Sequence, residues 1–218
     1  MALDYWLSES GVNVAFHAGL DTESKVIQNR KDSLKNYHID NLAYLNQIHS
    51  NIVLKGTSGG LIGNGDGIIL DKKGIVGLIM TADCNPVLLY DKRNDVLAML
   101  HVGRLGVESR IVFEGFKILS LEYGTRASDV FVYVGPSIRA CCYEVRSDVF
   151  CGDSLSLGKI MRKDSIYLDL IKVLQAQFLE LGFSDIVIDK NCTCCSREYF
   201  SYRRDKDCGR LGLFATII

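Results

Sequence analysis

The sequence predicts an α+β fold that is rich in strands and contains a few helices. Short apolar runs recur through the middle of the chain and alternate with polar turn segments such as DKKG and DKRND, which is typical of neighbouring β-strands. Two longer segments instead carry apolar residues at helical spacing. No repeat, low-complexity segment or linker interrupts the chain, and we therefore expect a single domain over residues 1–218.

The N-terminal part of the chain predicts two strands with a helix between them. Val12–His17 alternates apolar and polar residues, as a strand does. Thr22–Asn36 is polar, contains no Gly or Pro and follows Asp21, a good helix N-cap, so we expect an exposed helix. Leu42–His49 has side chains with a period of two, which predicts a second strand that His49 closes.

The middle of the chain predicts a loop followed by a sheet. Gly56–Gly67 is rich in glycine and has no helical periodicity, so we expect a mobile loop, and it lacks the GxxxxGK[ST] pattern of a phosphate-binding loop. Four short apolar runs then predict a meander-like sheet core: Ile68–Leu70, Ile75–Thr81, Val87–Tyr90 and Val96–His101.

The remaining elements are two helices and three strands. Gly106–Tyr123 has apolar residues near helical spacing, and Gly124 is a suitable C-cap. Leu168–Leu181 is the clearest amphipathic helix, and Gly182 should end it. We expect the last strands at Phe131–Val134, Ile186–Ile188 and Leu211–Ile218.

Charge and hydropathy weigh against nucleic acid and membrane as partners. Lysine and arginine number 25 against 26 aspartates and glutamates, so there is no basic field. No segment is long and apolar enough to cross a bilayer, and the N-terminus shows no export signal, so we expect a cytoplasmic protein. In that compartment, eight cysteines favour reduced thiols, metal ligation or reactive chemistry over disulfides.

A thiol and two imidazoles are the strongest candidates for a metal site. Cys84 and His101 lie at the ends of predicted strands, and His49 ends another, so His49, Cys84 and His101 form a ligand set that suits zinc. A buried free cysteine with two hydrogen-bonded histidines is the competing interpretation. Asp83 could orient an imidazole, move a proton or simply cap a turn. His17 is expected to be structural and His38 to be solvated.

The other cysteines are Cys141, Cys142, Cys151, Cys192, Cys194, Cys195 and Cys208. NCTCCS at 191–196 contains a CxxC pair, with Cys208 downstream, so a second, structural zinc is one interpretation. Buried free cysteines are the more common one, because no second CxxC or histidine accompanies the pair. The adjacent cysteines at 141–142 are expected to pack within a turn, and Cys151 carries no signal.

Six motifs occur in order along the chain: NQIH at 46–49, GDG at 65–67, TADC with Pro86 at 81–86, HVG at 101–103, GPSI with CCYEV at 135–145, and FSYRRD with GR at 200–210. Together they resemble the YfiH family, also called the laccase-domain or purine nucleoside phosphorylase family, over nearly the whole chain. The resemblance implies mixed β-sheets packed on each other and flanked by helices.

The resemblance also implies one zinc ion per chain, held by His49, Cys84 and His101 with a fourth position for water or substrate. The zinc-bound water and Asp83 would then be the catalytic groups. Copper is not expected, because four histidines without an HxH pair cannot supply a multicopper site.

Family members are similar in cleaving purine nucleosides with phosphate and in deaminating adenosine, and some are linked to peptidoglycan-precursor editing. The groups expected to contact nucleoside or phosphate are Asn46, Gln47, Arg104, Arg203, Arg204 and Arg210. A solvated charged turn is the alternative interpretation of the arginines at 203–210.

Two segments depart from the family pattern. This chain has HVGRLG at 101–106 where HAGWRG is usual, and Ser50 follows His49 where glycine is usual. The leading prediction is a zinc-dependent purine nucleoside enzyme. The alternatives are a hydrolase that edits peptidoglycan precursors and a catalytically weakened zinc-binding protein that acts through partners. The sequence does not indicate the oligomeric state.

Overall fold

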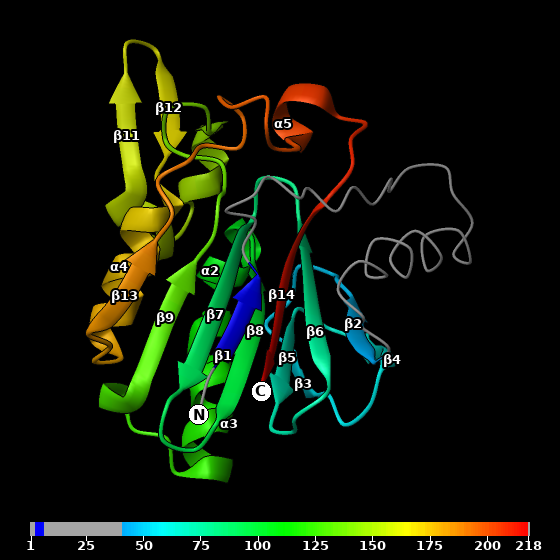
Figure 1. Cartoon of the computed structure of the whole chain (residues 1–218). Coiled ribbons are helices and arrows are strands. Elements are labelled where there is room, and N and C mark those ends of the chain that lie inside the picture. The colour runs from blue at the N-terminus through cyan, green and yellow to red at the C-terminus, as the bar shows by residue number, and fades with distance from the viewer. Residues whose placement is uncertain (1–2, 7–40, 218) are drawn as a thin grey trace.

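Two large β-sheets and a layer of helices form the body of the protein in the computed structural model, which describes residues 3–6 and 41–217 (Figure 1). The predicted strand at Val12–His17 and helix at Thr22–Asn36, like His17 and His38, lie outside these residues. The five-stranded sheet has the order β1 (Leu3–Trp6), β14 (Leu211–Ile217), β6 (Val76–Thr81), β2 (Leu42–Asn46) and β4 (Gly60–Asn64).

The six-stranded sheet has the order β13 (Asp185–Ile188), β9 (Val130–Val134), β7 (Asn85–Asp91), β8 (Val96–Val102), β5 (Gly67–Leu70) and β3 (Val53–Lys55). A small sheet has the order β10 (Glu144–Val145), β12 (Ser165–Leu168) and β11 (Lys159–Arg162). The α-helices in the described part of the chain are α2 (Arg104–Glu108), α3 (Ile111–Tyr123), α4 (Leu170–Glu180) and α5 (Tyr202–Asp205). Short 3₁₀ helices lie at Ala127–Asp129, Ser147–Phe150 and Asp153–Gly158.

The six-stranded sheet is the middle layer. One of its faces packs against the five-stranded sheet, through residues such as Leu88, Met99 and Ile79. Its other face packs against α2, α3 and α4, through residues such as Val132 and Leu174 (Figure 1). Every residue of β7 and β8 is buried, which explains why these strands are continuous apolar runs without alternation. The predicted α+β fold with packed mixed sheets and flanking helices is confirmed.

Two predictions about the sheets are wrong. The segment Gly56–Gly67 contains β4, which pairs in parallel with β2 and shifts register between Tyr44 and Leu45. Gly60 and Gly63 have positive φ angles of 108° and 155°, so this edge strand is irregular and has no alternating pattern. The predicted meander is wrong because β6 belongs to the five-stranded sheet, whereas β5, β7 and β8 pair in the other one.

The helix predicted at Gly106–Tyr123 is in fact two helices. Arg110 separates α2 from α3 and has a left-handed backbone with a φ of 58°. Gly124 ends α3 as predicted. The amphipathic helix α4 is confirmed, and the Asp169 side chain caps it by accepting a 3.0 Å hydrogen bond from the Lys172 N–H. No described helix has the length and apolar character needed to cross a membrane.

Candidate metal centre and adjoining cavity

A thiol and two imidazoles meet at one end of the large sheets. Cys84 lies in the connection between β6 and β7, His101 lies near the end of β8, and His49 follows β2 instead of closing it. Their ligand atoms all lie within 4.8 Å of one another. His49 Nε2 is 3.9 Å from Cys84 Sγ, and the two imidazole centroids are 4.7 Å apart. The fold thus brings together the three predicted ligands, and this group could hold a metal ion.

Asp66 connects the two histidines. Its fully buried Oδ1 accepts hydrogen bonds from His101 Nδ1 (2.7 Å) and from the His49 N–H (3.0 Å). Its Oδ2 accepts from the Ile48 N–H (3.3 Å), the Ser50 N–H (2.6 Å) and the Ser50 hydroxyl (2.7 Å). These bonds hold His49 in a left-handed conformation with a φ of 59°. One carboxylate therefore fixes the backbone at His49 and the ring of His101, which leaves Nε2 as the nitrogen that could bind a metal once it has lost its proton.

The same contacts shift three pKa values. Burial raises the pKa of Asp66, but hydrogen bonds from His101 and Ser50 outweigh burial and lower it to about 2. Burial lowers the pKa of His101, whereas Asp66 and Cys84 raise it to about 9. Burial raises the pKa of Cys84, whereas His101 and His49 lower it to about 7. The thiolate, which is the form of cysteine that binds metals, is therefore accessible near neutral pH.

Gly103 allows the backbone to approach the ligands closely. A Cβ atom at this position would lie 2.9 Å from Cys84 Sγ and 3.2 Å from His49 Cδ2. Because both distances are shorter than a normal van der Waals contact, any side chain here would displace a ligand. This close approach explains why position 103 of the HVG motif is a glycine.

A cavity of about 950 Å³ adjoins the three ligands. Part of its wall is apolar or aromatic and includes Tyr44, Leu45, Leu61, Ile138, Tyr143 and Leu170. Among the described residues that line it, one is acidic, Asp83, and four are cationic: Arg104, Arg203, Lys206 and Arg210. This excess of positive charge favours an anionic ligand beside the candidate metal centre.

Three of the predicted arginines line the cavity. Arg104 reaches it because it begins α2 after β8 has ended, and its Nη1 donates to Glu108 Oε1 at 2.7 Å. Arg203 donates to the Glu144 carbonyl oxygen at 2.8 Å, and Arg210 donates to the Cys208 carbonyl oxygen at 2.8 Å. Each guanidinium is therefore positioned by the protein.

Asn46 and Gln47 also line the cavity, but their amides are engaged with the protein. The Gln47 amide donates to the Met80 carbonyl oxygen (2.7 Å) and accepts from the Met80 N–H (2.8 Å). Asn46 donates to the Asn64 side chain at 2.9 Å. Both side chains therefore tie β2 to neighbouring strands at the cavity wall.

The side chains of Asp83 and Arg204 each form several hydrogen bonds with the protein. Asp83 has a φ of 90°, and its carboxylate accepts from the Thr193 hydroxyl (2.6 Å) and the Arg203 N–H (2.7 Å). This arrangement favours a role in positioning the turn that carries Cys84. Arg204 is not part of the cavity wall, because its guanidinium donates to several carbonyl oxygens between residues 193 and 199.

Four further side chains belong to the site although they were not among the predicted site residues: Asp66, Tyr143, Tyr202 and Lys206. Asp66 stood within the GDG motif, but its role depends on partners that are distant in the sequence. Tyr143 and Tyr202 stood within the CCYEV and FSYRRD motifs, and Lys206 directly follows the second of these, but no role was predicted for any of the three.

A family model described as multi-copper polyphenol oxidoreductase laccase matches residues 6–218. The chain belongs to this family, the YfiH or laccase-domain family. Two solved structures resemble this YfiH-family chain closely. The hypothetical protein YfiH of Bacillus licheniformis has a TM-score of 0.85 and 25% identity, and the match covers 95% of this chain and 86% of that one. YlmD of Geobacillus stearothermophilus has a TM-score of 0.85 and 25% identity, with 94% and 84% covered.

Two sequence relatives carry the name purine nucleoside phosphorylase. The relative from Clostridium acetobutylicum is 36% identical, and the match covers 98% of this chain and 90% of the relative. The relative from Corynebacterium glutamicum is 31% identical, with 91% and 83% covered. The family relation therefore extends over almost the full length of this YfiH-family chain.

Proposed function

We propose that this YfiH-family protein is a zinc-dependent purine nucleoside phosphorylase that also deaminates adenosine. The observation that carries the proposal is the group of His49, Cys84 and His101 beside a cavity with four cationic side chains. The names of the relatives supply the substrates, a purine nucleoside and phosphate.

The donor set supports zinc as the metal. One thiolate and two imidazoles are common zinc ligands, and three protein ligands leave one position open. Asp66 orients His101 as carboxylates orient zinc-bound histidines in other proteins. Although the name of the family model mentions copper, four histidines in the whole chain are too few for a multicopper oxidase.

The side chains of the cavity suit the two substrates. Arg203, Lys206 and Arg210 would bind phosphate, and Tyr143 with the other apolar wall residues would contact the nucleoside. In phosphorolysis, a phosphate oxygen bonds to ribose C1′ while the glycosidic C–N bond breaks, and the purine leaves with the electron pair. In deamination, water adds to the purine carbon and ammonia leaves. Bound zinc would supply Lewis-acid chemistry.

Purified protein loaded with zinc tests the proposal. We expect adenosine plus phosphate to yield ribose 1-phosphate and a purine base, and adenosine alone to yield inosine. Cys84→Ala should lose at least about 100-fold in both activities, because it removes a metal ligand. Cys151→Ala is the matched control, since Cys151 is exposed and lies outside the site. Arg210→Met should raise the KM for phosphate and leave the deamination rate unchanged.

Three results would overturn the proposal. The first is wild-type protein with one zinc ion in this site and no turnover of adenosine or inosine, which would favour a binding protein. The second is release of an amino acid from a muropeptide with no reaction of nucleosides, which would favour an editing hydrolase. The third is full activity of Cys84→Ala.

A further inference from the structure

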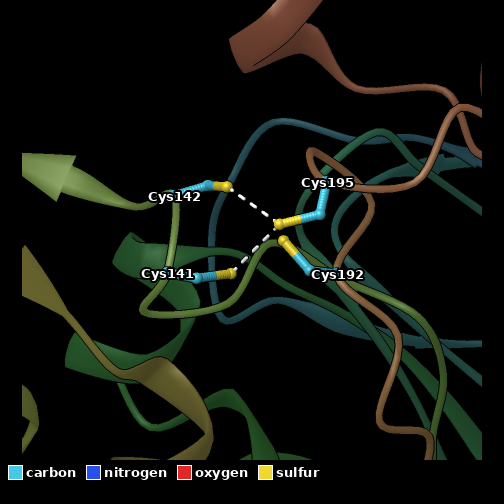
Figure 2. A group of neighbouring side chains, drawn as sticks. All are labelled: Cys141, Cys142, Cys192 and Cys195. Carbon is cyan, nitrogen blue, oxygen red and sulfur yellow. Dashed lines mark hydrogen bonds between the residues drawn. The ribbon is translucent and has the colours of Figure 1, made fainter.

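A second group of metal-binding side chains lies away from the candidate metal centre. Its four sulfurs belong to Cys141, Cys142, Cys192 and Cys195, which we call the four-cysteine cluster (Figure 2). All four are free cysteines. Neither the candidate metal centre nor the proposed reaction uses them, so their convergence needs a separate explanation.

The fold brings two distant segments together at the cluster. β9 and β13 pair in parallel, so the chain leaves both strands at the same edge of the six-stranded sheet. The pairing continues beyond the strands as a bridge between Ser137 and Cys192, and the Thr193 N–H donates to the Ser137 carbonyl oxygen at 3.1 Å. The turn after β9 therefore faces the loop after β13.

A tight turn directs the two adjacent cysteines toward the same point. The N–H groups of Cys142 and Tyr143 both donate to the Arg139 carbonyl oxygen, at 2.9 and 3.0 Å. Cys141 and Cys142 consequently both point toward Cys195 (Figure 2). On the other segment, the CxxC spacing places Cys192 and Cys195 side by side, a spacing typical of zinc-binding loops.

The sulfur positions suit a tetrahedral ion. All four sulfurs lie within 4.8 Å of one another, and Cys195 Sγ is 3.3 Å from Cys141 Sγ and 3.2 Å from Cys142 Sγ. A disulfide would require a distance of about 2.0 Å. Tetrahedral zinc with Zn–S bonds of about 2.3 Å separates its sulfurs by about 3.8 Å. The cluster therefore needs only small movements to surround zinc, and Cys195 can form a disulfide with just one of its neighbours.

A hydrogen-bond donor and three positive charges lie close to the cluster. The Arg139 N–H donates to Cys192 Sγ at 3.4 Å, a contact typical of zinc-bound sulfur. Three arginines bind carbonyl oxygens of the two segments: Arg139 at Asn191 (3.4 Å), Arg203 at Cys142 (3.3 Å) and Arg204 at Cys194 (3.3 Å). Their charges would offset the net charge of about −2 on zinc with four thiolates.

We propose that the four-cysteine cluster binds a structural zinc ion that fastens the turn after β9 to the loop after β13. Four protein ligands close the coordination sphere, as in structural zinc sites. Both segments support the cavity. Tyr143 lines it, and the Thr193 hydroxyl and Arg203 N–H hold Asp83, which precedes Cys84. The second zinc would thus keep one wall of the cavity in place.

Metal analysis of the zinc-loaded, reduced full-length protein tests the proposal. We expect about two zinc ions per chain in the wild type and about one in Cys195→Ser. The matched controls Cys151→Ser and Cys208→Ser should keep both ions. The double variant His49→Ala/Cys84→Ala leaves the cluster unchanged, and it should retain one ion whose X-ray absorption spectrum shows sulfur ligands alone. The ion retained by the double variant tests the cluster even if the protein lacks the proposed enzymatic activity and even if Cys195→Ser does not fold.

The proposal fails if the double variant binds no zinc, or if its zinc has nitrogen or oxygen ligands. It also fails if iodoacetamide alkylates all four cysteines of the native, zinc-treated double variant as fast as it alkylates Cys151. The alternative explanation for the cluster is a disulfide, which mass spectrometry of the protein after zinc loading and removal of the reductant would detect. A loss of two hydrogens that maps to Cys195 would identify a disulfide in place of a metal site.

Discussion

At the scale of single residues, Asp66 organises the candidate metal centre although it is not one of the three ligands. Asp66 accepts hydrogen bonds from the backbone at His49, which is 17 residues away in the sequence, and from the ring of His101, which is 35 residues away. The chemistry of His49, Cys84 and His101 and their family motifs were enough to predict that these three side chains come together. The sequence did not allow the role of Asp66 to be predicted, because that role exists only once distant strands are adjacent.

Replacing Asp66 with asparagine should weaken metal binding and folding together. An amide replaces one of the two carboxylate oxygens with an NH₂ group, so buried donors would face each other either at the His101 ring or at the Ser50 N–H. We expect Asp66→Asn to lose about 1–3 kcal/mol of unfolding free energy and to bind zinc about 10–100-fold more weakly. Chemical denaturation of the metal-free protein and competition with a zinc chelator measure the two effects.

Ser50→Ala is the matched control for Asp66→Asn. It removes the hydroxyl bond to Asp66 Oδ2 and leaves the His101 contact intact. We therefore expect a loss of stability of about 1 kcal/mol with zinc affinity within a few-fold of the wild type. Equal zinc affinities for wild type and Asp66→Asn would show that Asp66 does not orient the ligands.

The pH dependence of zinc binding follows from the two shifted ligand pKa values. In the metal-free protein the pKa of Cys84 is about 7 and that of His101 is about 9. Zinc must displace both protons below pH 7 and only the His101 proton between pH 7 and 9. The decimal logarithm of the zinc affinity should thus rise by about two per pH unit below pH 7 and by about one per pH unit between pH 7 and 9. Calorimetry in buffers of different protonation enthalpy measures this release, and a constant release from about pH 6 to 9 would contradict the assignment.

At the scale of elements, the sequence predicts the helices and strands whose pattern is visible in neighbouring residues. The runs that became β7 and β8 are apolar throughout because they are buried on both faces, and α4 has a clear apolar stripe and is followed by Gly182. Elements that depend on distant partners were missed or misplaced. β4 exists because β2 offers it an edge, and β6 joins a different sheet from the strands on either side of it in sequence.

The break between α2 and α3 is a further element that periodicity could not reveal. Arg110 adopts a left-handed backbone without being glycine, and its side chain lies 3.6 Å from the Phe113 ring centroid and forms an ion pair with Glu180. A left-handed backbone costs a residue other than glycine about 1 kcal/mol, and no periodicity in the sequence signals it. The break matters for the site because it makes α2 a short separate helix that begins with Arg104 beside the cavity.

At the scale of the whole molecule, the two large sheets must pack closely enough for loops from both to share one site. His49 follows a strand of the five-stranded sheet, whereas His101 lies in the six-stranded sheet and Cys84 joins the two. The spacing of the sheets therefore sets the spacing of the ligands. Gly77 of β6 is a point of close approach, because a Cβ atom there would lie 2.3 Å from Met99 Sδ and 3.0 Å from Leu70 Cδ1.

Gly77→Ala should therefore force the sheets apart and destabilise the protein by about 1–3 kcal/mol, as overpacking does in other cores. Met99 is fully buried, so its side chain cannot move into solvent to make room. Met99→Ala removes the nearer obstructing atom and leaves Leu70, so in that background Gly77→Ala should cost clearly less, giving a coupling energy of about 1–3 kcal/mol in a double-mutant cycle. Urea denaturation of the wild type, the two single variants and the double variant measures the coupling.

Gly152→Ala is the control for Gly77→Ala, since a Cβ atom at Gly152 would meet nothing within 4 Å. Additive effects of the two core substitutions would mean that Gly77 and Met99 do not set the spacing of the sheets.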